Sequence, residues 1–93
     1  MFLIKVVMKV DFRKVEVETN FDGTKEVIDI SKQLANYAKM KTSDIAFEDF
    51  CREIYYNGEV EINDAQKREL LAIVNESKFF AYIKRGIINL LNN

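Results

Sequence analysis

The sequence predicts an α+β domain in which an N-terminal β-hairpin packs on about four α-helices. Three observations favour this class. Apolar and polar residues alternate near the N-terminus, residues 20–23 (Asn-Phe-Asp-Gly) are typical of a hairpin turn, and apolar residues recur at helical spacing from about residue 32. We expect a single domain over residues 1–93, because the chain contains no proline, no repeat and no low-complexity segment that would mark a linker.

The first strand is predicted where apolar side chains alternate with mostly polar ones. After an interruption at Arg13 and Lys14 the alternation resumes, so the chain contains either a bulge or a tight bend at that point. The alternating apolar residues are Ile4, Val6, Met8, Val10, Phe12, Val15 and Val17.

The segment after the turn is compatible with two structures. Residues 26–30 form a second extended run, but Val27, Ile30 and Leu34 also fall at helical spacing, which would start a helix at Thr24. We favour a strand up to Ile30, with Ser31 as the N-cap of a first helix over about residues 32–41.

The remaining chain predicts three more helices and a short strand. Ser43 is the expected cap of a helix over residues 44–56, which Asn57 and Gly58 end. Residues 59–62 alternate and are expected to add a third strand to the hairpin. Asn63 and Gln66 predict a capping box for the next helix, and a turn or bend at residues 75–77 leads to a final helix over residues 79–91.

The residue types present argue against an enzyme, a cofactor and a metal site. The chain has no histidine, which excludes Ser-His-Asp and Cys-His triads and most transition-metal sites. Its three glycines are too far apart for a phosphate-binding loop. Cys51 lies on the apolar stripe of the second helix, where core packing is the expected role. A single cysteine, no secretory pattern and no membrane-spanning stretch predict a cytoplasmic protein.

The middle of the chain is acidic although the net charge is only −1. Between positions 42 and 64 the sequence contains seven acidic residues and only one basic residue, Arg52. The second helix can present its carboxylates as a solvated face, as a docking face for a basic partner, or as a cation or catalytic site. The candidate acidic docking face consists of Asp44, Glu48, Asp49 and Glu53.

The last helix is more apolar than a helix resting on one core requires. Its stripe is either ordinary core or a surface for a protein partner or for self-association, for example as a dimer. The candidate interaction surface consists of Phe79, Phe80, Tyr82, Ile83, Ile87, Ile88 and Leu91. Gly86 interrupts this helix, and it either lets another backbone approach closely or weakens the helix.

Nucleic acid is not an expected partner. Basic residues on the last two helices form a thin patch, beside which Tyr82 is a candidate stacking residue, and the near-neutral net charge disfavours a large phosphate footprint. The patch consists of Lys67, Arg68, Lys78, Lys84 and Arg85.

Two segments resemble a group of small uncharacterised proteins of phages, prophages and related mobile elements. They are MKVDFRKVEVETNFDGTKEVIDISKQLANYA, which begins at Met8, and REIYYNGEVEI, which begins at Arg52. Residues 1–7 precede the resemblance, so Met8 is an alternative start. The shared motifs are a hairpin, a capped helix and a turn followed by a strand, and the resemblance therefore implies no catalytic residue.

Together these features favour a non-enzymatic protein-binding or assembly module of phage or mobile-element origin. The alternative is a regulator or inhibitor that acts on nucleic acid or on a nucleic-acid-binding host protein.

Overall fold

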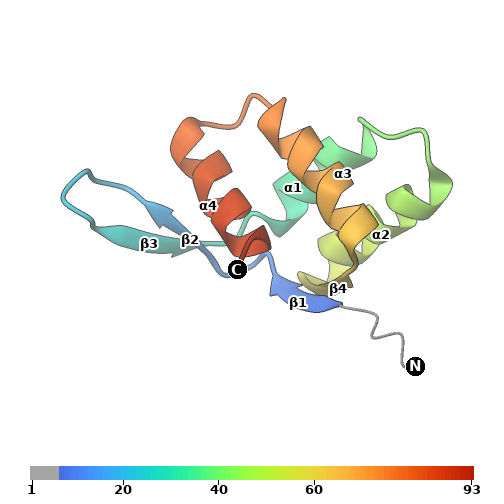
Figure 1. Ribbon diagram of the computed structural model, residues 1–93, viewed down its shortest axis with the longest axis horizontal. Helices are drawn as coiled ribbons and strands as arrows, with labels where there is room; N and C mark the ends of the chain where they lie inside the picture. Colours follow the sequence, from blue (N-terminus) through green and yellow to red (C-terminus); the bar gives the residue numbers. More distant parts are fainter. Residues whose placement is uncertain (1–6) are drawn as a thin grey trace, which may run out of the picture.

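The computed structural model describes residues 7–93 and confirms the α+β class (Figure 1). The predicted strand residues Ile4 and Val6 lie outside the described part. In chain order the elements are β1 (Met8–Asp11), β2 (Val15–Glu18), β3 (Lys25–Ile28), α1 (Ser31–Lys39), α2 (Ile45–Asn57), β4 (Glu59–Ile62), α3 (Asp64–Asn75) and α4 (Ala81–Leu91).

The strands form two separate two-stranded antiparallel sheets within the described residues. β2 and β3 make the predicted hairpin, so the segment after the turn is a strand and not a helix. The third strand is present, but the prediction that it joins this hairpin is wrong. β4 pairs with β1, placing Val10 opposite Val60, and has no pairing with β2 or β3.

A tight bend between β1 and β2 separates the two sheets. The Asp11 carboxylate accepts hydrogen bonds from the backbone N–H of Arg13 at 3.0 Å and from its guanidinium at 2.9 Å. At the corner, the buried Phe12 donates its N–H to the Gly58 carbonyl at 2.9 Å and accepts from the N–H of Ile30 at 3.0 Å. Phe12 therefore ties the end of each sheet to the other, and the interruption at residues 13–14 is a bend.

The structure contradicts two of the three predicted helix N-caps and confirms the third. Ser31 is the first residue of α1 rather than its cap, and its N–H and hydroxyl donate to the Asp29 carboxylate at 3.0 and 2.6 Å. Asp44, not Ser43, caps α2, because its carboxylate accepts from the N–H of Ala46 at 3.0 Å. The capping box of Asn63 and Gln66 is present at the start of α3.

The core lies between the four helices, the β1–β4 sheet and β2, and α4 packs directly on β2 (Figure 1). A Cβ atom at Gly86 would stand 2.7 Å from the Glu16 carbonyl oxygen and 2.7 Å from Val17 Cγ1. Because Gly86 has no side chain, the backbone of β2 can approach α4 closely at this position. Of the two explanations that the sequence allows for Gly86, the structure supports the close approach of another backbone. The largest fully buried side chains are Phe12, Leu34, Ile54, Ile62, Leu70, Ile87 and Leu91.

The hairpin extends beyond the helices at one end of the molecule, which measures 46 × 34 × 23 Å (Figure 1). The four helices and the β1–β4 sheet occupy the rest. Over residues 7–93, no helix combines the length and the apolar character that crossing a membrane requires.

Candidate protein-interaction site

The projecting hairpin is the most exposed element, and we call residues 15–28 the β-arm. Its base is fixed because Val15 and Val17 are buried in the core, next to α4. Its turn is closed by the Asp22 carboxylate, which accepts from the N–H of Thr24 at 2.9 Å and from its hydroxyl at 2.6 Å. The hydroxyl bond from Thr24 lowers the pKa of Asp22. The β-arm is thus held to the core at its base and closed by hydrogen bonds at its turn.

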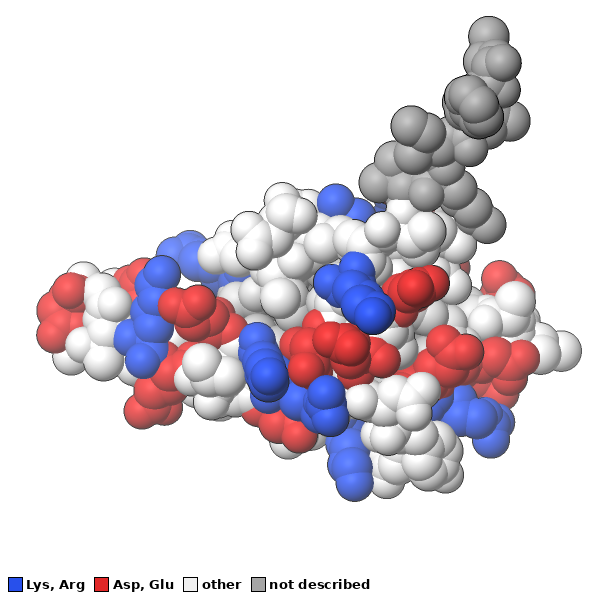
Figure 2. Space-filling model, turned by 90° about the horizontal axis from the view of Figure 1, so that it is seen from below, with Lys and Arg blue, Asp and Glu red and all other residues white. Residues whose placement is uncertain are grey.

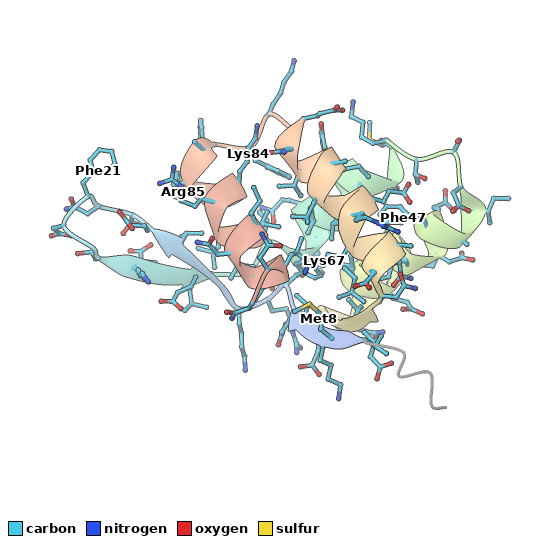
Figure 3. All side chains as sticks on the ribbon, viewed as in Figure 1. Met8, Phe21, Phe47, Lys67, Lys84 and Arg85 are labelled. Carbon is cyan, nitrogen blue, oxygen red and sulfur yellow. The ribbon has the colours of Figure 1, made fainter. Side chains whose placement is uncertain are left out.

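An aromatic side chain occupies the tip of the β-arm. Phe21 is fully exposed and stands out from the turn at the end of the β-arm that lies far from the helices (Figure 3). Burying such a ring against an apolar partner is worth about 1.5–3 kcal/mol, so its exposure leaves a substantial binding contribution unused. Met40 and Ile45 are also exposed, but scattered apolar residues of this kind are normal on a protein surface.

A groove of about 920 Å³ lies beside the contact of α4 with β2 and is lined by residues of the β-arm and of α4. Tyr82 and Leu90 give it an apolar side, Phe21 stands at its rim, and Arg85 contributes a cation. The charges are mixed, since the groove also contains Lys and Glu side chains of the arm. Its other lining residues are Lys14, Glu16, Glu18, Thr19, Asn20, Lys25, Ala81, Gly86, Asn89 and Asn93.

Most of the predicted surface on the last helix belongs to the core. Ile87 and Leu91 are completely buried, so their assignment to an interaction surface is wrong. The partly buried Phe79, Ile83 and Ile88 pack against the same core. The broad apolar stripe suggested a free surface, but its width reflects burial on two sides of α4, by β2 and by α3.

Two aromatic residues of that prediction do lie on the surface. Phe80 is 72% exposed and Tyr82 is 45% exposed. Their rings stack with centroids 6.3 Å apart and an angle of 11° between the planes. Tyr82 lines the groove, and Phe80 adds a second exposed ring next to it.

The acidic residues of α2 divide into structural and solvated side chains. Asp44 caps the helix, and Glu48 forms an ion pair with Arg52 at 3.6 Å. Asp49 and Glu53 are exposed. Residues 7–93 contain no cluster of three or more His, Cys, Asp or Glu side chains placed to hold a metal ion.

The basic residues of the last two helices do not form one surface. The Lys84 ammonium donates to the Asn75 carbonyl at 3.1 Å and so ties α4 to the end of α3. Arg85 instead lies on the side of α4 that faces the β-arm (Figure 3). Figure 2 shows acidic and basic side chains interspersed over the face seen there, including the arm at the left.

Cys51 is a core residue, as expected. Its side chain is buried beside Phe47 and Ile54 in the apolar core. Burial raises the pKa of the Cys51 thiol to about 11, so the nucleophilic thiolate is scarce at neutral pH.

The sequence reasoning missed Phe21 and Val27 as surface candidates. Phe21 stands in a turn between three polar or glycine residues, and an aromatic side chain at a hairpin tip is itself a signal for exposure. Val27 is 64% exposed on β3, and the ambiguity between strand and helix for this segment hid its orientation.

Comparisons with known proteins find no match among protein-family models, curated proteins or solved structures.

Proposed function

We propose that the chain is a non-enzymatic protein-binding or assembly module that engages a protein partner through the tip of its β-arm. The observation that carries this proposal is the fully exposed Phe21 at the end of an anchored, projecting hairpin. An aromatic ring on a rigid element is a frequent anchor of protein interfaces, where it fills an apolar pocket of the partner. The phage or mobile-element origin rests on the sequence resemblance, and the cytoplasmic location on the single cysteine.

The charge of the β-arm indicates what kind of partner it fits. The β-arm, residues 15–28, carries four carboxylates against one cation, Lys25. A partner with an apolar pocket inside a basic surface complements both the ring and the charge. The regulator alternative corresponds to the case in which that partner is a nucleic-acid-binding host protein, whose basic surface the acidic arm would occupy.

Capture from the cells that produce the chain tests the proposal. Immobilised protein is expected to retain a partner that Phe21→Ala no longer retains, while the control Met40→Ala, at another exposed apolar residue, still retains it. The partner, identified by mass spectrometry and purified, should bind Phe21→Ala at least about tenfold more weakly, equivalent to 1.4 kcal/mol. Raised salt should slow its association.

Equal binding by wild type and Phe21→Ala would contradict the proposal. Capture of nothing by the wild type would contradict it as well. If the captured partner binds nucleic acid, and if that nucleic acid and the chain compete for binding to it, the result would favour the regulator alternative.

A further inference from the structure

The outer edge of β3 is open. Within residues 7–93, β3 pairs with β2 on one side and with no strand on the other. Lys25, Glu26 and Val27 are exposed, and only Ile28 is partly buried. An open edge presents a row of backbone N–H and C=O groups on which another strand can pair.

The hydrogen-bond phase of the hairpin identifies the residues whose backbone groups point outward. Thr19 donates its N–H to the Thr24 carbonyl at 3.0 Å, and the pairing continues with Val17 opposite Glu26. In an antiparallel ladder such bonded pairs alternate with non-bonded pairs. Lys25 and Val27 belong to the non-bonded pairs with β2, so their N–H and C=O groups face the open edge.

The side chains along this edge are self-complementary. Because side chains alternate between the faces of a strand, Lys25 and Val27 share one face of β3, and Asp29 follows directly after the strand, which gives the order cation, apolar residue, anion. Lys25 forms an ion pair with Glu16 at 3.7 Å within its own hairpin. The Oδ1 atom of Asp29 accepts from Ser31, so its other carboxylate oxygen is the one that would meet a Lys25 ammonium of the second copy. An antiparallel copy of this strand presents the reverse order. With Val27 opposite Val27, each Lys25 stands opposite an Asp29.

We propose that the chain forms a two-fold homodimer in which the β3 edges of two copies pair antiparallel, with Val27 on the axis. The two hairpins become one four-stranded sheet in the order β2-β3-β3-β2. Moving the axis to Glu26 would place two carboxylates opposite each other, and moving it to Ile28 would place Val27 opposite Asp29. The register on Val27 is the one that pairs opposite charges.

The dimer would carry two arm tips that point in opposite directions. In the hairpin register Phe21 lies level with Asp22, five residues from Val27, so two tips would be roughly 30 Å apart at about 3.3 Å per residue. Such an arrangement is bivalent toward a partner. The dimer itself does not depend on the proposed partner binding, because it uses the strand edge and leaves the tip free.

Sedimentation of the purified full chain tests the dimer without any partner. We expect a mass that rises with concentration toward twice the 10.9 kDa of one chain. Val27→Lys places two ammonium groups on the axis and should weaken dimerisation at least about tenfold. Met40→Lys and Phe21→Ala should leave the mass unchanged, which separates this inference from the proposed function. A monomer at millimolar concentration, or a dimer indifferent to Val27→Lys, would overturn it.

A disulfide tests the register directly. Residues that form a bonded antiparallel pair have Cα atoms about 5.5 Å apart, within the range that a disulfide spans. Val27→Cys should therefore form a covalent dimer on mild oxidation, and the buried Cys51 should not take part. The control Glu16→Cys lies on β2, away from the proposed axis, and should form no covalent dimer under the same conditions. Equal cross-linking at both positions would exclude the Val27 register.

Discussion

Gly86 is the residue at which α4 and β2 come closest. The nearest groups to its missing side chain are a backbone carbonyl and a buried valine, neither of which can swing away as the end of a long side chain would. A helix glycine costs about 1 kcal/mol relative to alanine, so the position sacrifices helix stability to let the β-arm dock. The glycine therefore supports the arm indirectly, by fixing its base.

Gly86→Ala is expected to destabilise the fold. Overpacking by the added methyl group costs about 1–3 kcal/mol, whereas the higher helix propensity of alanine contributes about 1 kcal/mol of stability. We therefore expect the free energy of unfolding to fall by about 1–2 kcal/mol. Urea unfolding measures this change. Asn89→Ala, an exposed substitution on the same helix, should stay within about 0.5 kcal/mol of wild type. A Gly86→Ala protein as stable as wild type would show that α4 can move away from β2 at no cost.

At the scale of the elements, α2 depends on its cap. Asp44 supplies the carboxylate that the first turn requires, and its own N–H is held by the Thr42 hydroxyl at 3.1 Å. One of the four residues of the candidate acidic docking face thus has a structural role. Its neighbour Ser43 makes no such bond to α2, so the two positions form a matched pair.

Asp44→Ala should lower the free energy of unfolding by about 1 kcal/mol, because the N–H of Ala46 loses its acceptor. Ser43→Ala should change it by less than about 0.5 kcal/mol. Chemical denaturation of the two variants side by side provides the comparison. The reverse order of stabilities would mean that Ser43 is the cap after all.

Local chemistry in the sequence was enough to place most elements. The Asp-Gly turn, the capping box at Asn63 and the Asn57-Gly58 stop each act within a few residues, and each appears in the structure. The predicted cap at Ser43 is wrong by one position, because the Asp44 carboxylate accepts from the N–H of Ala46. The predicted cap at Ser31 is wrong because Ser31 is the first residue of α1 and its own N–H and hydroxyl donate to Asp29.

Strand pairing and burial were beyond the sequence because they depend on distant contacts. Nothing local distinguishes β4 pairing with β1 from β4 joining the hairpin, since the choice follows from the bend around Phe12. Likewise, the apolar stripe of α4 has the same pattern whether it meets solvent or two neighbours. Only the packing of α4 between β2 and α3 assigns Ile87 to the core.

At the scale of the whole molecule, the helices and the β1–β4 sheet form a scaffold that holds out the β-arm (Figure 1). The scaffold buries most apolar residues of its helices, although Ile45, Tyr56 and Tyr82 stay exposed, and the arm exposes Phe21 at its tip and Val27 at its open edge. The interaction role that we propose concentrates on residues 15–28 at one end of the molecule. The tip and the edge of that arm are separate surfaces and can be tested separately.

Photo-cross-linking in the producing cells tests the central claim, that the tip of the β-arm contacts a protein partner. A benzophenone amino acid replaces Phe21 in one variant and Met40, which is also exposed, in the other. The account predicts a discrete covalent adduct with one protein other than the chain itself from position 21, and none from position 40. No adduct from position 21, or the same adducts from both positions, would contradict it.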